Sequence, residues 1–148
     1  RKSECVNFVM AHLQKSKVTL RIMGDDLVPS EITKLLGASP TAAESKGEKI
    51  TKPKTGTTRI AKSGSWRLRA KSCEPENIDG QIAQILNQLT DDLTVWHEIK
   101  KRYRVDLFCG LFLGSSNEGL TISVKSLRAL SERGIEAGFD IYALFDEE

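Results

Sequence analysis

The residues most able to do chemistry are the basic ones between positions 46 and 71. This stretch holds nine Lys or Arg residues and a single acid, Glu48. The whole chain has 22 basic and 20 acidic residues, so its net charge of +2 conceals a strong local excess of positive charge. Lys and Arg bind phosphates and carboxylates, and a charge split of this size can attract an anionic partner. The stretch therefore predicts a binding surface for a negatively charged group.

We assign this surface to six residues. Trp66 could stack on a flat ligand, although it shares a strand face with Leu68 and Ala70, which is typical of a core position. The alternative interpretation is a solvated loop whose charge keeps a sheet edge from pairing with other chains. A nucleic acid is a further candidate ligand, but no recognition-helix, RNP-type or GXXG pattern is present. The predicted ligand-binding residues are Lys46, Arg59, Lys62, Trp66, Arg67 and Arg69.

Four aspartates form a second candidate site. Asp25 and Asp26 end a predicted strand, where paired carboxylates could hold a metal or act as acid and base. One of them could instead cap the turn that precedes Pro29. Asp106 and Asp140 lie in later predicted strands, on the faces opposite their apolar neighbours. An enzyme with an acidic active site built from these residues is the alternative function.

The cysteines and histidines give little support for catalysis. Cys5, Cys73 and Cys109 are widely spaced, and no CxxC pair or zinc-ligand spacing occurs. Cys109 lies in an apolar strand and behaves as a core residue, so a nucleophilic pair with His97 would require it to leave the core. We predict no cofactor, no metal and three reduced thiols, a pattern that fits a cytoplasmic protein.

Alternation of apolar and polar side chains predicts the strands that must position these residues. Strands are expected at residues 18–23 and 65–71, and an apolar run predicts a central strand at 104–113. A returning strand at 120–124 would form a hairpin with that central strand. A final strand at 135–144 would turn four residues inward, namely Ile135, Ala137, Phe139 and Ile141.

Helical spacing of apolar residues predicts the other layer. Helices are expected at residues 29–36 and 125–133, and a helical region at 77–102 should break into two at 90–92. Long amphipathic helices need a sheet face to cover their apolar stripes. The chain is therefore predicted to be an α+β two-layer sandwich, with a mostly antiparallel or mixed sheet of about five to six strands and helices mainly on one face.

Three segments define the predicted domain organisation. Residues 1–148 are expected to form a single domain of common size. Residues 42–64 lack periodicity and predict a long basic surface loop, with a possible edge strand at 57–62. Residues 144–148 are an acidic tail that we expect to fray.

Phe108 and Phe112 pose a separate question, because they lie on the second face of the predicted central strand. If helices cover only one sheet face, these rings are exposed and mark a dimer or partner interface. The alternative is that Trp66, the loop or the N-terminal segment covers them.

Several local patterns, taken in order along the chain, resemble one known family. They are GDDLVPSEI at 24–32, LLG at 35–37, Pro40 with Thr41, KGE at 46–48, GSW at 64–66, VDLFC at 105–109 and FDIY at 139–142. Together they resemble a bacterial domain-of-unknown-function family, number four-two-seven-nine. The resemblance implies a small cytoplasmic α+β domain without established activity, so it supplies no catalytic residues. Some small proteins of this kind act as immunity or accessory proteins beside toxin genes.

These observations predict a non-enzymatic binding or interaction module that recognises a protein or a small anionic ligand. The chain is expected to act as a monomer or homodimer. No apolar run is long enough for a membrane helix, and the first residues lack the pattern of a signal peptide. We therefore expect no membrane partner and a cytoplasmic location.

Overall fold

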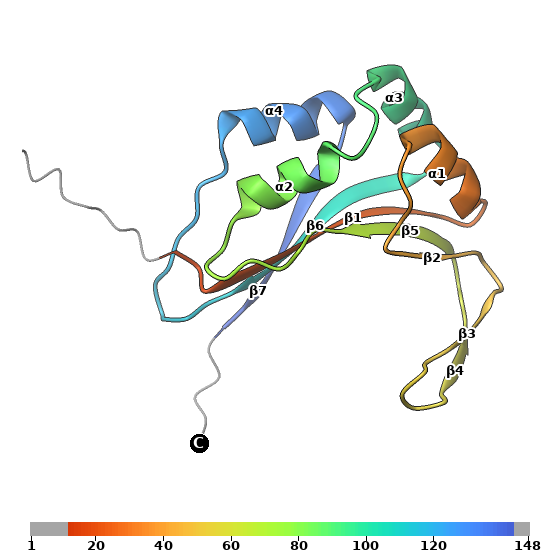
Figure 1. Ribbon diagram of the computed structural model, residues 1–148, viewed down its shortest axis with the longest axis horizontal. Helices are drawn as coiled ribbons and strands as arrows, with labels where there is room; N and C mark the ends of the chain where they lie inside the picture. Colours follow the sequence, from red (N-terminus) through yellow and green to blue (C-terminus); the bar gives the residue numbers. More distant parts are fainter. Residues whose placement is uncertain (1–11, 144–148) are drawn as a thin grey trace, which may run out of the picture.

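A computed structural model describes residues 12–143, which form an α+β fold (Figure 1). Four helices lie on one face of a mixed five-stranded sheet, and a two-stranded hairpin projects on the other side. Both the fold class and the one-sided placement of the helices confirm the prediction. In spatial order the strands are β2 (Ala42–Glu44), β5 (Gly64–Arg69), β1 (Lys15–Gly24), β6 (Arg104–Phe112) and β7 (Glu136–Tyr142). The helices are α1 (Pro29–Leu36), α2 (Ile78–Leu86), α3 (Leu93–Arg102) and α4 (Val124–Arg133).

Strand β1 is the centre of the sheet, because it pairs antiparallel with β5 on one side and with β6 on the other. Its side chains alternate between the two faces. Val18, Leu20 and Ile22 are at most 1% exposed and belong to the core beneath the helices. Thr19 and Arg21 point to the opposite face, since successive strand residues alternate in direction. The predicted strand at 18–23 is therefore correct in its position and in its faces.

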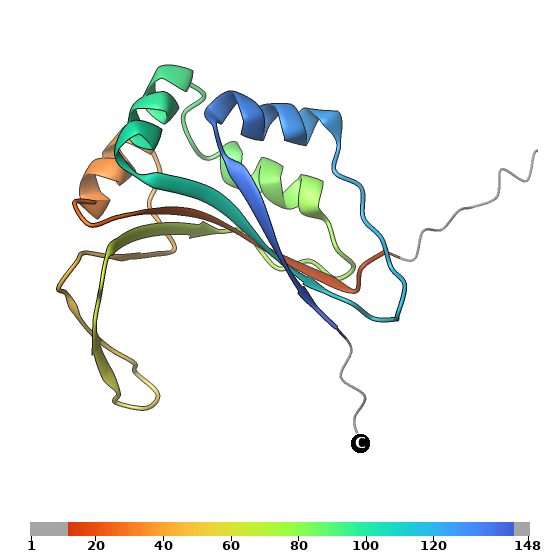
Figure 2. The same ribbon diagram turned by 180° about the vertical axis from the view of Figure 1, so that it is seen from behind.

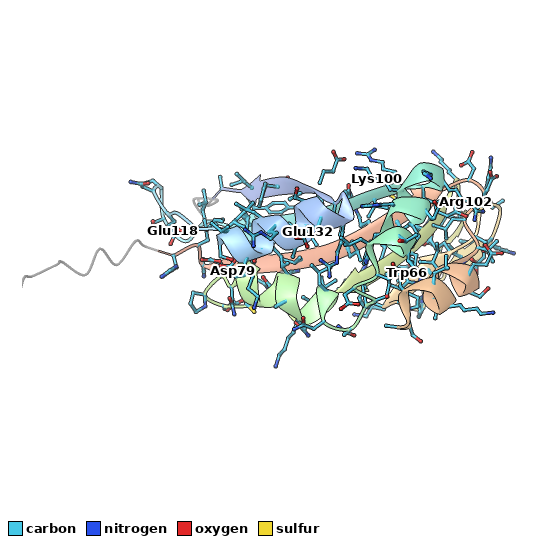
Figure 3. All side chains as sticks on the ribbon, turned by 90° about the horizontal axis from the view of Figure 1, so that it is seen from above. Trp66, Asp79, Lys100, Arg102, Glu118 and Glu132 are labelled. Carbon is cyan, nitrogen blue, oxygen red and sulfur yellow. The ribbon has the colours of Figure 1, made fainter. Side chains whose placement is uncertain are left out.

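The chain after β6 does not form the predicted hairpin. Residues 120–123 are not a strand, and Gly119 makes only an isolated bridge with His12. Instead, the backbone N–H and the hydroxyl of Ser123 donate to Asp79 Oδ1 at 3.0 and 3.1 Å. These bonds draw the chain toward the start of α2 in the helix layer, where α4 begins (Figure 3). The neighbour of β6 is therefore β7, which runs parallel to it after the α4 crossover.

Residues 42–64, predicted as a long loop, contain three short strands. β2 pairs with the edge of β5, and β3 (Lys49–Thr51) pairs with β4 (Thr58–Ile60). The strand predicted at 57–62 coincides with β4. Each of these strands has only three residues, which is too short to leave a periodic pattern. Figure 2 shows that the β3–β4 hairpin leaves the sheet on the side away from the helices.

Strand β7 differs from its predicted burial. Ile135, just before the strand, is buried, but Phe139 and Ile141 are 43% and 61% exposed. The sequence pattern predicts that both point into the core, together with Ala137, which is also exposed. The reason is the position of β7, because it is the outer strand of the sheet and all seven of its residues are exposed (Figure 1).

A buried polar network fixes α2 to the sheet. Ser16 Oγ donates to Gln81 Oε1 at 2.6 Å, and Gln81 Nε2 donates to the carbonyl oxygens of Ser16 and Lys71 at 2.9 and 3.0 Å. Ser16 Oγ also accepts the backbone N–H of Asn77, the N-cap residue of α2. Ser16 and Gln81 are at most 1% exposed, so these groups depend on one another for hydrogen bonds.

We expect Gln81→Leu to lower the free energy of unfolding by about 2–3 kcal/mol, because it leaves buried polar groups without partners. Urea denaturation followed by circular dichroism measures the change. The matched control is Gln88→Leu at an exposed position after α2, which should change the stability by less than about 0.5 kcal/mol. Equal effects of the two substitutions would contradict a structural role for the network.

Candidate ligand-binding face

The face of the main sheet away from the helices carries the candidate site, and we name it the open face. Its side chains stand in rows that the strand pairing defines. One row consists of Arg67, Arg21, Asp106 and Glu136 on β5, β1, β6 and β7. The next row consists of Arg69, Thr19, Phe108 and Gly138 on the same strands. Charged groups from strands that are distant in sequence thus become direct neighbours.

The open face contains a hollow of about 500 Å³, which we name the cationic hollow. Four basic side chains and three aromatic rings line it, and no carboxylate does. This volume lies in the range of small-molecule sites, although such sites are usually more apolar. The charged and aromatic lining residues are Lys17, Arg21, Arg67, Arg69, Phe108, Phe112 and Tyr142.

Arg21 is the paired cation of the hollow. Its Nε and Nη2 donate to the two carboxylate oxygens of Asp106 at 2.8 and 2.6 Å. The hydrogen bond with Asp106 raises the pKa of Arg21, against the opposing effect of burial. The guanidinium carbon also lies 4.6 Å from the centre of the Phe108 ring. Arg21 is therefore a fixed part of the floor, and Asp106 balances much of its charge.

The other three cations of the hollow, Lys17, Arg67 and Arg69, form no salt bridge with any residue in the range 12–143. Arg67 stands directly opposite Arg21 on the neighbouring strand, which places two like charges side by side. The Nε of Arg67 is buried and has no hydrogen-bond partner. A buried donor without a partner costs free energy, and the unpaired charges of the three cations favour a carboxylate or phosphate as ligand. The hollow is therefore suited to an anion.

Phe112 and Tyr142 form the aromatic end of the hollow. Their rings stack with centroids 4.6 Å apart and an interplanar angle of 10°. The ammonium groups of Lys15 and Lys17 each lie 5.6 Å from the centre of the Phe112 ring. Phe108 and Phe112 are half-buried, and their cover on this face comes from cationic side chains and Tyr142. The aromatic end adds flat apolar surface beside the positive charges.

Two of the six predicted ligand-binding residues, Arg67 and Arg69, line the hollow. Trp66 does not, and its prediction as a stacking residue is wrong. It is 0% exposed, and its Nε1 donates to Thr33 Oγ1 of α1 at 3.1 Å. Figure 3 shows Trp66 on the helix side of the sheet, next to α1. Because side chains alternate along β5, Trp66 must point away from the face that Arg67 and Arg69 occupy.

The other three predicted residues lie outside the hollow. Lys46 Nζ donates to Asp25 Oδ2 at 3.1 Å, a hydrogen bond that lowers the pKa of Asp25. Arg59 in β4 pairs with Glu44 in β2, and this bond raises the pKa of Arg59. Lys62 is exposed between β4 and β5. The positive charge of residues 46–62 is thus partly neutralised locally and is not gathered with Arg67 and Arg69.

Lys17, Arg21 and Tyr142 are residues of the hollow that sequence reasoning missed. The alternating pattern of residues 18–23 already placed Arg21 on a solvent face, so a signal was present. The pattern does not show which strand pairs with β1, because the pairing of β1 with β5 joins segments that are distant in sequence.

The four aspartates of the alternative enzyme site are not brought together. Asp25 and Asp26 are exposed in the turn after β1, whereas Asp106 is held by the guanidinium group in the floor of the hollow. Asp140 accepts a hydrogen bond of 2.7 Å from the Tyr142 hydroxyl, which raises the pKa of Tyr142. Within residues 12–143, no group of three His, Cys, Asp or Glu side chains is placed to hold a metal ion.

Asp106 and Asp140 do share the open face, but they lie far apart along it. Asp140 pairs with Gly110, four residues beyond Asp106 on β6. At about 3.3 Å per residue, this offset separates the two carboxylates by roughly 13 Å along the strands. The geometry therefore offers no joint acid and base from this pair.

The protein is thus an α+β domain with helices on one sheet face and a cationic hollow on the other. Residues 14–144 match a family described as a domain of unknown function, DUF4279. The chain belongs to this family, as the local patterns in its sequence had indicated. No curated protein and no solved structure matches the chain. Among the described residues, no helix has both the length and the apolar character needed to cross a membrane.

Cys109 is a buried thiol rather than a nucleophile. It is 0% exposed, and burial, followed by the charge of Asp106, raises its pKa to about 12. The His97 ring lies on α3 and contacts the Glu132 carbonyl oxygen at 3.1 Å. A neutral thiol in the core cannot attack a substrate that reaches only the surface.

We expect Cys109 to stay unmodified when the native protein is treated with iodoacetamide at pH 8, because a thiol with a pKa of about 12 is almost entirely protonated and is inaccessible. Cys73, which is partly exposed, should be alkylated under the same conditions. Peptide mass spectrometry after quenching measures both sites, and a parallel reaction in urea should modify Cys109. Native modification of Cys109 at the rate of Cys73 would contradict the assignment.

Proposed function

We propose that this domain is a non-enzymatic binding module whose open face receives an acidic segment of a partner protein. The observation that carries the proposal is a hollow of about 500 Å³ in which three of four cations have no salt-bridge partner among residues 12–143. Guanidinium and ammonium groups form strong charge-assisted hydrogen bonds with carboxylates.

The spacing of the cations supports an extended ligand. Arg67 and Arg69 follow each other at an interval of two residues on β5, as do Lys15 and Lys17 on β1, although Lys15 also forms a salt bridge of 3.5 Å with Glu74. Arg67 is level with Arg21, and Lys15 lies six positions before Arg21 on β1. At about 3.3 Å per residue the cationic strip is roughly 20 Å long. An extended peptide of about six residues covers this length and points alternate side chains to one face.

A nucleic acid matches the same face less well. Asp106, Glu136 and Asp140 also lie on the open face, within or beside the rows that contain the cations. A nucleic acid carries a negative charge at every nucleotide, so phosphates would be forced near these carboxylates. A peptide can place uncharged residues at those positions, which favours a protein as partner.

We also propose that the module works in the bacterial cytoplasm. The free thiols of Cys73 and Cys109 support this location, because reduced cysteines are typical of cytosolic proteins. The bacterial assignment is supported by the family resemblance.

Charge reversal in the hollow tests the proposed function. We expect Arg67→Glu/Arg69→Glu to weaken binding of a fluorescein-labelled glutamate-rich peptide by about tenfold or more, because attraction becomes repulsion at two positions. Fluorescence anisotropy at low ionic strength measures the affinity, which should fall as salt is added. The matched control is Lys34→Glu/Arg128→Glu, which makes the same charge change at exposed helix positions. It should change the affinity by less than about threefold.

Two outcomes would overturn this proposal. Equal weakening by both double variants, with circular dichroism showing both to be folded, would mean that only net charge matters. Tighter binding of a single-stranded oligonucleotide than of the peptide, with the same dependence on Arg67 and Arg69, would replace the protein partner with a nucleic acid.

A second substitution tests the role of the paired cation. We expect Asp106→Asn to strengthen peptide binding by about threefold, because Arg21 is then no longer neutralised and the hollow gains net positive charge. The same anisotropy titration measures the effect. Asp25→Asn is the matched control, since Asp25 also pairs with a cation, Lys46, but outside the hollow. An unchanged affinity of Asp106→Asn would show that the Arg21 charge does not reach the peptide.

A further inference from the structure

Strand β7 forms an open edge of the main sheet. It pairs with β6 on one side only, and no other described strand covers its outer side. The carbonyl oxygen of Tyr142 accepts the N–H of Leu113, so Tyr142 directs its backbone groups toward β6. Because backbone groups alternate along a strand, Ala137, Phe139 and Ile141 direct theirs outward. These outward groups are the hydrogen-bonding partners that an added strand requires.

The elements at this edge carry most of the exposed large hydrophobic side chains of the described residues. Of the eight large hydrophobic side chains exposed among the described residues, five belong to α4 and β7. They are Val124, Leu127, Phe139, Ile141 and Tyr142. Phe139 and Ile141 lie on the helix face of β7, the same side as α4. The edge therefore offers both free backbone groups and exposed apolar side chains, an arrangement that is typical of an interaction surface.

We propose that the occupant of this edge is β7 of a second copy of the chain, paired antiparallel and centred on Phe139. A two-fold axis perpendicular to the sheet would place Phe139 opposite Phe139 of the partner copy. In this register Ala137 stands opposite Ile141, so every outward-directed residue meets another outward-directed residue. All outward backbone groups of the strand are then paired, and the side chains of Ala137, Phe139 and Ile141 of the two copies meet on the helix face.

The charges on β7 favour this register over its neighbouring registers. Glu136 would stand opposite Tyr142 of the other copy, and Asp140 opposite Gly138, so no two carboxylates are opposed. A shift of the centre to Asp140 would oppose Asp140 to itself, and a shift to Gly138 would oppose Glu136 to Asp140. Like charges directly opposite each other destabilise a strand pair. Only the Phe139-centred register overlaps all seven residues of β7, and it is free of this repulsion.

The two ends of the sheet differ in a way that gives a closed dimer rather than a fibre. The opposite edge is β2, which has three residues, whereas β7 has seven. Pairing of β7 with itself uses the same surface on both copies, so it is isologous and closes after two subunits. β7 also lacks proline and lysine, two residues with which proteins protect exposed edges.

Sedimentation velocity on the full chain at micromolar to hundred-micromolar concentrations tests this proposal. We expect a dimer in the wild type and a monomer in Phe139→Asp, because this change opposes two carboxylates at the centre of the interface. The control is Leu35→Asp, which replaces a similarly exposed apolar residue on α1 and should leave the dimer intact. A wild-type monomer over this range, or a Phe139→Asp dimer, would overturn the proposal.

Disulfide trapping tests the register itself, in a background with Cys5 and Cys73 replaced by Ser. In Phe139→Cys the opposed Cα atoms would be about 5.5 Å apart, within reach of a disulfide, and oxidised glutathione should link the copies. In Gly138→Cys the two Cα atoms would be about 8 Å apart, which is too far to bridge. Gly138 has no atom within 4 Å of an added Cβ, so the substitution should not disturb the fold. Equal cross-linking of both variants would reject the register.

Discussion

The alternation of side chains along β1 is the constraint on which the rest of the structure depends. Val18, Leu20 and Ile22 are almost completely buried under the helices, so the residues between them must emerge on the other side of the sheet. The helices lie on one side only, and the emerging side chains are therefore free to be charged. A one-residue slip of β1 would move Arg21 into the core, where an unpaired cation is very costly. The register that builds the core thus also builds the open face.

Arg21 and Asp106 show how one pair of opposite charges organises that face. Their bidentate contact joins β1 to β6 and holds the guanidinium group over Phe108. Because Asp106 is satisfied by Arg21, it has little capacity left for the next cation in the row, Arg67. The excess positive charge is consequently displaced toward β5 and the far end of β1. This uneven distribution of charge over the open face matters more for recognition than the net charge of +2.

The local sequence pattern was enough to predict elements that have a clear hydrophobic periodicity or a local start signal such as Pro29. The strand of Val18 and Leu20, the helix that begins at Pro29 and the apolar strand around Leu107 all appear where expected. The hairpin predicted after β6 failed, because contacts between Ser123 and Asp79, which are distant in sequence, direct the chain into the helix layer. Pairing between distant residues cannot be deduced from composition, since it depends on which strands become neighbours.

The same limit applied to the candidate site. The sequence shows the excess of basic residues at positions 46–71. It does not show which of these residues pair with carboxylates and which remain unpaired. Lys46 and Arg59 pair with carboxylates from other segments, whereas Arg67 lies between Ala42 and Arg21, and Arg69 lies opposite Thr19. Trp66, adjacent in sequence, is separated from Arg67 by the thickness of the sheet. Proximity along the chain was therefore misleading, and proximity across the strands decides which charges can act together.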